Sequence, residues 1–438
     1  MQGPPETGGP CCFGAETGRK NTAYPRSDHG DVSAGSLERI ACFVSKSGEF
    51  HVSFVDKVSY FIQRSEEKSM RARIFAAILI TLAGLTGCIK GNKQFVYVTG
   101  QTSNQVFGFQ QSGDGSLAPM GNPNFGTGSQ PTAVVIHAPG DFAYITNFAG
   151  NNVTLLDVNK GNGELSVPVS TLVIPPPTPP NIFNTGIGPI AMAISPTDPF
   201  LYVLNQGAAT ISAFTIDPGT GDLGLISGPA VPTPVAPQSI AISPKGNFVF
   251  VASPSTGNVA VFAVSTAAGS KGSLSAVGAP LNMGAGATPN FVTVDAGGRF
   301  LYVADTAHNT VLGFAIQSSG TLAAIAGSPF AAGTQPKAIA SDAQGAFLFV
   351  ANSGSNNVSA YVIDSATGAL GQASGSPFPT GGTGPGFVAA IGGYVYVGDQ
   401  GTNDVAAFLV GPAGQLSAVK GSPFNVAVSP AWISTLSQ

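Results

Sequence analysis

The stretch FLYVAD at residues 300–305 is one of seven closely related segments in the chain. Each segment is a proline-free run of β-branched and aromatic residues ending in Gly, Asn, Ser or Asp, a pattern typical of a buried strand entering a turn. The copies follow one another about every 50 residues, which indicates a repeated structural unit. They are FVYVTG (95–100), FAYITN (142–147), FLYVLN (200–205), FVFVAS (248–253), FLYVAD (300–305), FLFVAN (347–352) and YVYVGD (394–399).

Three further signals surround the copies. A proline followed by apolar residues precedes the strand, as in Pro289/Val292/Val294, and proline is tolerated at the first residue of a strand. A hairpin strand such as NNVSAY (356–361) follows, and a Gly-x-Leu strand such as 320–322 closes the unit. Four strands in about 50 residues predict one blade of a β-propeller.

The two chain ends predict how the ring closes. The first unit begins at its second strand, Phe95, and lacks the proline-led strand. The C-terminal segment 429–433 carries the proline-led pattern, with no second strand after it. We therefore expect these segments to pair and to close an all-β, seven-bladed propeller of four-stranded antiparallel blades over residues 95–438.

Residues 70–88 have the features of a secretory signal. Two arginines precede an uncharged apolar run, Ile74–Leu85, which is too short for the ~20 residues of a membrane-spanning helix. The run ends in Leu85-Thr86-Gly87-Cys88, which resembles the lipobox of bacterial lipoproteins and implies cleavage and acylation at Cys88. The alternative is a buried helix that ends in cysteine.

This signal predicts the organisation of the N-terminal part. We interpret 1–69 as a non-native or disordered extension, with translation starting at Met70 after the purine-rich codons expected for Glu66-Glu67-Lys68. The alternative is a cytoplasmic extension on an internal anchor. Residues 89–94 form a short linker that would hold the propeller close to the membrane. We expect a lipid-anchored protein outside the cytoplasm, in the inner or the outer membrane of the cell envelope.

The charge of the mature part excludes one class of partner. From Ile89 onward there are eight basic and thirteen acidic residues, with one arginine, Arg299. Nucleic-acid binding is not expected, because it requires clustered Lys and Arg to neutralise phosphates. Cys88 is the one cysteine of the processed chain, so stability has to come from packing rather than from disulfides.

The YVTN-like strands and the Ser-Pro-x-Gly turn at 243–246 resemble those of the YVTN-repeat, lactonase-family seven-bladed propellers, whose best-known enzyme is 6-phosphogluconolactonase. The resemblance covers residues 95–436 and implies a lactone-hydrolysing or ligand-binding propeller with its site at one end of the axial channel. A phosphorylated sugar acid would need several Arg or Lys donors. Arg299 shares the opposite-rim turn position with His137, so we do not expect 6-phosphogluconolactonase activity itself.

The residues that close the second strands form the candidate rim. A ligand ring there would use Asn147, Asn205, Asn352, Asp399 and Asp404, whereas the alternative is that such side chains only satisfy adjacent turns. Asp305 could orient His308 as a general base for water attack on a lactone carbonyl, with Lys337 at the channel mouth. No cofactor is predicted, although a divalent cation would fit an axial channel lined by oxygens.

Two functions follow from these residues. One is hydrolysis of an uncharged or weakly charged lactone at Asp305, His308 and Lys337. The other is a surface propeller that binds a small molecule, glycan or protein at one rim, or serves as an adhesion scaffold, without catalysis. The scarcity of charged residues favours binding. The proline-rich insert 173–184 is interpreted as a stiff connector.

Overall fold

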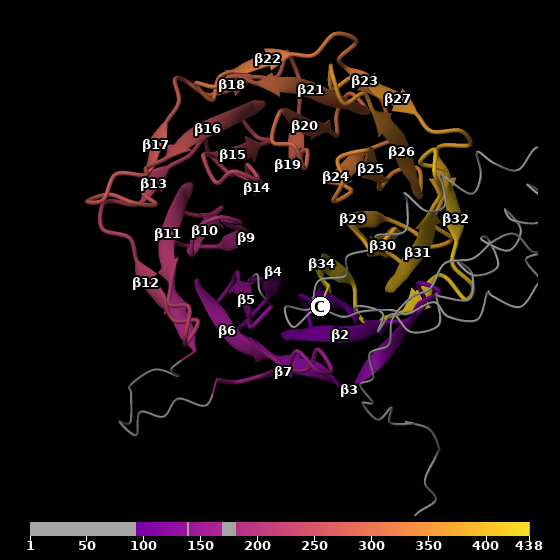
Figure 1. Cartoon of the computed structure of the whole chain (residues 1–438), viewed down its shortest axis with the longest axis horizontal. Coiled ribbons are helices and arrows are strands. Elements are labelled where there is room, and N and C mark those ends of the chain that lie inside the picture. The colour runs from indigo at the N-terminus through magenta and orange to yellow at the C-terminus, as the bar shows by residue number, and fades with distance from the viewer. Residues whose placement is uncertain (1–92, 138–139, 169–180, 438) are drawn as a thin grey trace, which may run out of the picture. The chain divides into compact units, whose positions relative to one another are not determined.

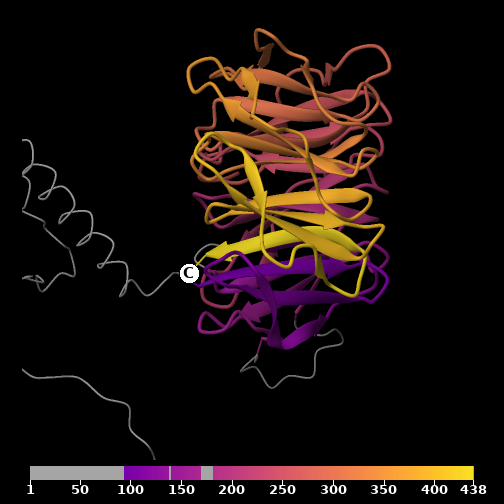
Figure 2. The ribbon, with the colours of Figure 1, turned by 90° about the vertical axis from the view of Figure 1, so that its right-hand side faces the viewer.

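The strands form seven antiparallel sheets arranged around a common axis. The computed structural model describes residues 93–137, 140–168 and 181–437, and within these ranges the predicted seven-bladed propeller is confirmed (Figure 1). Figure 2 shows the ring from the side, with successive blades stacked against one another. We number blade one as the sheet that contains β1 and count the blades along the chain.

Each blade has the same strand order from the axis outward. The inner strands are β34 (Pro430–Ser437), β4 (Pro131–Ile136), β9 (Pro189–Ile194), β14 (Ser239–Ile242), β19 (Pro289–Val294), β24 (Pro336–Ser341) and β29 (Pro385–Ile391). The second strands are β1 (Gln94–Gly100), β5 (Phe142–Asn147), β10 (Phe200–Asn205), β15 (Phe248–Ser253), β20 (Phe300–Asp305), β25 (Phe347–Asn352) and β30 (Tyr394–Asp399). The third strands are β2 (Gln105–Gln111), β6 (Asn152–Val158), β11 (Thr210–Ile216), β16 (Asn258–Val264), β21 (Thr310–Ile316), β26 (Asn357–Ile363) and β31 (Asp404–Val410).

The outer strands differ from the simple four-strand expectation. Blade one has one long outer strand, β3 (Leu117–Gly126), whereas in the other blades the outer position is divided into two short segments that both pair with the third strand. The pairs are β7 (Leu165–Ser166) with β8 (Ile182–Asn184), β12 (Leu223–Leu225) with β13 (Val231–Pro232), β17 (Leu274–Ala276) with β18 (Leu281–Asn282), β22 (Leu322–Ala324) with β23 (Phe330–Ala331), β27 (Leu370–Gln372) with β28 (Phe378–Pro379), and β32 (Leu416–Ala418) with β33 (Phe424–Asn425).

The predicted closure of the ring is confirmed. The C-terminal strand β34 pairs antiparallel with β1, with Val98 opposite Ile433 and Thr99 opposite Trp432. Blade one is therefore built from both ends of the propeller, in the order β3-β2-β1-β34. The ring has no free inner edge at this blade, because the terminal strand fills it.

The repeated aromatic residues of the second strands hold neighbouring blades together. Phe300 packs its ring over Gly368 of the next blade, where an added Cβ would lie 2.5 Å from the ring. Gly368 also has a φ of +76°, which favours glycine. Two residues after Phe300, the buried Tyr302 hydroxyl donates to the Gly368 carbonyl at 2.8 Å. The glycine of the Gly-x-Leu pattern is thus the partner of the YVTN-like strand.

We expect Tyr302→Phe to lower the free energy of unfolding by about 1 kcal/mol, because the buried Gly368 carbonyl loses its donor. Urea unfolding followed by circular dichroism measures this change. Blade four has Phe250 at the equivalent position, so this position of a blade accepts a phenylalanine ring without the hydroxyl. The matched control is Phe250→Tyr, which supplies a hydroxyl and should not destabilise. Equal losses in both variants would contradict a role for the hydrogen bond.

The membrane-related predictions lie outside the described residues. These are the extension 1–69, the signal 70–88 with Cys88 and most of the linker 89–94. Residues 173–180 of the proline-rich insert 173–184 are likewise not described, whereas its end was wrongly interpreted as connector, because 182–184 pair with β6 as strand β8. Within the described ranges, no helix has the length and apolar character needed to span a bilayer.

Candidate functional site

The second strands end on the same rim at which the inner strands begin, because the two are antiparallel. Pro131 pairs with Asn147, and Pro289 pairs with Asp305. We call this rim the site rim, defined by the last residues of the second strands and the first residues of the inner strands. The turns that carry His137 and Arg299 join inner to second strands and therefore lie at the opposite rim, as expected.

Three of the predicted rim residues have their amide nitrogens bonded inside the sheet, while their Oδ1 atoms have no partner among the described residues. Asn147, Asn205 and Asn352 are fully buried. Asn147 donates through Nδ2 to Asn152 Oδ1 at 2.7 Å and to Thr154 Oγ1 at 2.8 Å, and Asn205 and Asn352 make equivalent bonds across their hairpins. These amides fix the hairpin between second and third strands, and their side chains are not presented to solvent.

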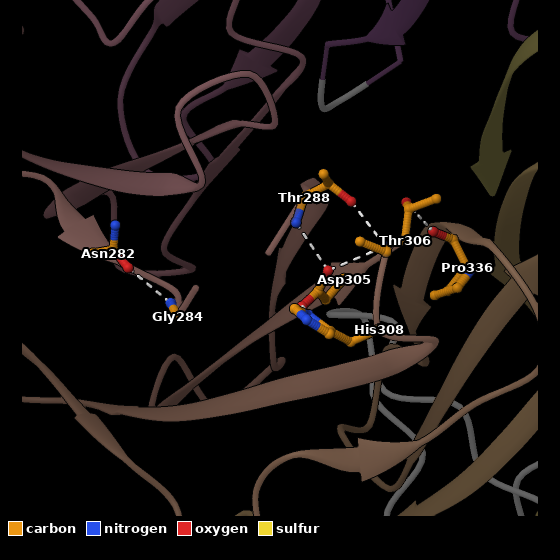
Figure 3. A network of polar contacts seen from close by, with 8 residues as sticks. Asn282, Gly284, Thr288, Asp305, Thr306, His308 and Pro336 are labelled. Atoms are coloured by element: carbon orange, nitrogen blue, oxygen red, sulfur yellow. Dashed lines mark hydrogen bonds and ion pairs between the residues drawn. The ribbon is translucent and has the colours of Figure 1, made fainter. Parts of the chain in front are cut away.

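Asp305 and His308 form a direct pair in blade five (Figure 3). His308 Nδ1 lies 2.6 Å from Asp305 Oδ2. The Asp305 side chain is 2% exposed and the His308 side chain is 50% exposed. A buried carboxylate that accepts the Nδ1 proton leaves Nε2 as the unprotonated nitrogen of a neutral imidazole. The geometry is that of an oriented base with one face open to solvent.

A second contact fixes the Asp305 carboxylate. Oδ1 of Asp305 accepts the backbone amides of Thr288 at 2.9 Å and Ala307 at 3.2 Å. Thr288 Oγ1 also accepts the Ala307 amide at 2.8 Å. The carboxylate is therefore held by the connection between blades four and five as well as by its own hairpin, which leaves Oδ2 directed to the imidazole.

This arrangement depends on a residue that differs between blades. In four blades the hairpin ends in an asparagine with positive φ whose Oδ1 accepts an amide of the next connection at 2.8 Å; these residues are Asn104, Asn151, Asn309 and Asn356. Blade four has Gly257 at this position. With no asparagine side chain there, the Thr288 amide is available to Asp305.

A glycine-rich connection passes beside His308. Six residues, 283–288, stand between the outer strand and the strand-leading Pro289, whereas four or five stand before the corresponding proline in other blades: 185–188, 233–236, 332–335, 380–384 and 426–429. A Cβ placed on Gly286 would lie 3.9 Å from His308 Cε1 and Nε2, and one placed on Gly284 would meet nothing within 4 Å. Among the described residues, the amides of Ala285 and Gly286 donate to no acceptor. The connection therefore leaves both open space and free donors next to the base.

Lys337 lies on the neighbouring blade. In six blades a register shift follows the strand-leading proline, and the residue after it is left out of the pairing, as Lys337 is in β24. Such bulges re-aim side chains and recur beside active sites. Thr306 Oγ1 donates to the Pro336 carbonyl at 2.7 Å and so links the two blades. Lys337 is the one charged residue in the seven described inner strands.

An aromatic cluster crosses the axis below the site rim. Trp432 of blade one lies 4.4 Å from Phe387 of blade seven and 6.0 Å from Phe291 of blade five, measured between ring centroids. Phe291 and Phe387 are themselves 5.5 Å apart. Blades five and one are not neighbours in the ring, so these contacts span the centre, which the inner strands surround in Figure 1.

Asp399 and Asp404 form a pair of carboxyl groups in blade seven. They occupy opposite positions of the hairpin, where Asn147 faces Asn152 in blade two. Asp399 is fully buried, and both of its oxygens lack a hydrogen-bond partner in the described structure, as does Asp404 Oδ1. Burial raises the pKa of Asp399 to about 7, and the Asp404 charge adds to the rise. The pair therefore retains a proton near neutral pH.

We expect this pair to make the protein less stable as pH rises. An unfolded Asp loses its proton near pH 3.9, whereas folded Asp399 holds it to about pH 7. Between these values the folded state binds more protons, so the free energy of unfolding falls with increasing pH and levels off above about 7. Asp399→Asn, which restores the amide of blades two, three and six, should remove this decline.

We expect Asp399→Asn to raise the free energy of unfolding by about 2 kcal/mol at pH 8 and to change it little at pH 4. Urea unfolding at pH 4, 6 and 8 measures it. Asp217→Asn, at a position fully exposed on the outer turn of blade three, is the matched control and should leave the decline in place. Parallel curves for the parent and Asp399→Asn would rule out the buried carboxyl as its source.

Sequence reasoning brought Asp305 and His308 together but missed the elements around them. The glycine-rich connection was visible only as a slightly longer spacing before Pro289, and the axial position of Trp432 had no local signal. Lys337 was found because it follows a strand-leading proline, and the same rule would have marked the other bulged residues. Within the described ranges, no group of three His, Cys, Asp or Glu side chains is placed to hold a metal ion.

Comparisons with known proteins agree with this architecture. A family profile described as "Lactonase, 7-bladed beta-propeller" matches residues 88–288 and 280–384. No curated protein matches the sequence. Among solved structures, a candidate 6-phosphogluconolactonase from Bacteroides uniformis superposes with a TM-score of 0.64 at 17% identity, covering 79% of this chain and 100% of its own.

Two further structures have the same fold. The periplasmic gluconolactonase from Pseudomonas aeruginosa superposes with a TM-score of 0.62 at 20% identity, covering 79% of this chain and 99% of its own. A protein from Lactobacillus plantarum superposes with a TM-score of 0.63 at 17% identity, covering 79% of this chain and 99% of its own. At these identities the structures establish the fold, and the profile, which spans most of the propeller, establishes the family. The chain belongs to the lactonase family of seven-bladed β-propellers.

Proposed function

We propose that the protein hydrolyses a lactone at the site rim, with His308 as the general base. The observation that carries this proposal is the 2.6 Å contact between His308 Nδ1 and a buried Asp305 oxygen. Such a carboxylate orients the imidazole and stabilises the cation that forms when Nε2 takes a proton. Family membership is consistent with this chemistry.

The reaction needs one proton carrier. Water attacks the lactone carbonyl carbon while His308 Nε2 accepts its proton, and the carbonyl oxygen becomes an oxyanion. The amides of Ala285 and Gly286, which have no acceptor among the described residues, lie on the connection beside this base and are the donors proposed to stabilise the oxyanion. When the tetrahedral intermediate collapses, the ring C–O bond breaks and the leaving alkoxide takes the proton from His308. The product is an open-chain hydroxy acid.

The surroundings of the site favour a substrate with little charge. Lys337 is the one charged residue in the described inner strands, and one lysine matches at most one acidic group. A doubly charged phosphate ester would lack the clustered Arg or Lys donors that bind it. We therefore propose that a neutral sugar lactone, or one with a single acidic group, is the substrate.

A pH-stat assay of the purified protein with a panel of lactones tests this function. We expect turnover of neutral aldonolactones and weaker turnover of 6-phosphogluconolactone. Lys337→Ala should raise the KM of an acidic lactone and leave that of a neutral one unchanged. No hydrolysis of any lactone in the panel would overturn the proposal.

Ligand binding without catalysis is the second candidate, favoured by the scarcity of charged residues at the rim. It predicts that the same lactones, or glycans, bind in calorimetry without being opened. Saturable binding together with an unchanged ligand, recovered intact after incubation, would select this alternative over hydrolysis.

We further propose that the protein is exported and held at a membrane of the cell envelope by acyl chains on Cys88. The signal-like segment 70–88 supports this location, and the structurally similar protein from Pseudomonas aeruginosa is named periplasmic. Mass spectrometry of the native protein tests it. An N-terminal peptide beginning at acylated Cys88 is expected, whereas peptides from residues 1–69 in the native protein would contradict it.

A further inference from the structure

The divided outer strand of blades five to seven is filled by a repeated Gly-Ser-Pro-Phe segment. In each of these blades the serine hydroxyl accepts a third-strand amide: Gly313 N to Ser328 Oγ at 3.0 Å, Ala360 N to Ser376 Oγ at 2.9 Å, and Ala407 N to Ser422 Oγ at 2.8 Å. The phenylalanine then begins the second outer segment and is partly buried, as Phe330 is in β23. The segment thus supplies one acceptor and one apolar ring.

Blades three and four lack this filling. Ala213 and Val261 occupy the position of Gly313, because each pairs with the third residue of its second strand. Their carbonyls accept Ile226 N at 2.9 Å and Val277 N at 2.8 Å, as the Gly313 carbonyl accepts Ile325 N at 3.0 Å. Their own amides, however, donate to no acceptor among the described residues.

The sequence explains the missing acceptors. Residues 226–231 of blade three align without a gap with 325–330 of blade five, which places Pro229 where Ser328 stands. Proline has no hydroxyl to accept the amide. In blade four the corresponding segment, 277–281, is one residue shorter and contains no serine. Val231 and Leu281 replace the phenylalanine in the paired positions.

Two adjoining cavities lie where the filling is absent. One, of about 580 Å³, includes Ala213, Ile226 and Pro229 in its walls, and the other, of about 450 Å³, includes Val261. Both share Phe262 of β16 and Ala276 of β17 in their walls. No charged residue lines either cavity. Leu225 and Val235, on their walls, are 69% and 66% exposed.

We propose that these cavities form one groove that binds an extended, uncharged peptide segment of another protein. We call it the outer groove, defined by residues 211–213, 225–235 and 260–262. The occupant presents a hydroxyl or carbonyl oxygen to the Ala213 or Val261 amide and an apolar ring to Phe262. This is the chemistry with which the molecule itself fills the equivalent places in blades five to seven.

The probe for this proposal is a fluorescein-labelled peptide of residues 325–333, IAGSPFAAG, added to the purified full-length protein. Fluorescence anisotropy should rise saturably, with a Kd below about 1 mM. The control peptide IAGAPAAAG, which lacks the hydroxyl and the ring, should bind about tenfold more weakly. Its failure to differ from the first peptide would overturn the proposed recognition.

Three protein variants locate the site. Leu225→Ser should weaken binding several-fold, while Leu409→Ser, at a leucine 48% exposed on blade seven, should leave it unchanged. The double substitution Pro229→Ser with Val231→Phe fills the groove from within and should abolish binding. A cooperative melting curve of this variant checks that it is folded.

Three outcomes would overturn the proposal. They are the absence of saturable binding up to about 1 mM peptide, equal effects of the two leucine variants, and a dimer in sedimentation that Leu225→Ser abolishes. The last result would mean that a second copy of the chain is the occupant. None of these experiments depends on lactone turnover.

Discussion

Replacing His308 by alanine is expected to lower kcat for lactone opening by a factor of about 10²–10⁴, the usual contribution of a positioned general base. The side chain lies in a surface turn and is half exposed, so the change should not unfold the protein. The substitution removes only the imidazole ring beside Gly286 and its bond to Asp305. A pH-stat assay at saturating lactone measures the effect directly.

A matched control is available for this experiment. His137 is the other histidine within the described residues and stands at the opposite rim, between β4 and β5. His137→Gln should leave kcat unchanged. Asp305→Asn should lose much of the activity as well, because an amide can no longer stabilise the imidazolium. Full activity in the His308→Ala enzyme would remove the Asp305–His308 pair from the mechanism.

Removing the C-terminal strand is expected to have the largest effect on stability. A chain that ends at Ser429 lacks β34, and with it every pairing of β1 on the axial side. It also loses the buried Ile433 and Leu436, and Trp432 with its contacts across the axis. These losses are comparable with the roughly 5–15 kcal/mol by which a typical domain is stable, so we expect no cooperative thermal transition.

Adding the missing strand as a peptide checks that the loss comes from an open ring. A synthetic peptide of residues 430–437 should restore a cooperative transition, measured by circular dichroism. The same peptide with Ile433→Asp places a charge at a site that is 2% exposed and should fail to do so. A cooperative transition of the truncated chain alone would contradict the importance of closure.

Much of the fold could be predicted from sequence because its determinants are local and repeated. The strand-turn pattern of residues 300–305 reflects a strand buried on both faces, and its repetition fixes the number of blades. The pairing of the two ends followed from complementary missing strands. The division of the outer strand could not be read, since segments of two or three residues such as β23 carry no periodicity.

The site was harder to predict, for a physical reason. Asp305 and His308 are close in sequence, so their contact could be predicted. What orients Asp305 is an amide of Thr288, which became available because the preceding blade has Gly257 in place of asparagine. Such a cause depends on three segments that meet only in the folded ring. The buried state of Asn147 likewise arises from tertiary packing.

The meeting of Trp432, Phe291 and Phe387 across the axis has a kinetic consequence. Because aromatic rings from blades one, five and seven meet at the axis, we expect the hydroxy acid of the proposed reaction to leave by the same rim at which the lactone binds. Substrate and product then use the same rim. Accumulating product should compete with incoming lactone, which initial-rate measurements with added hydroxy acid would reveal as a rising KM at constant kcat.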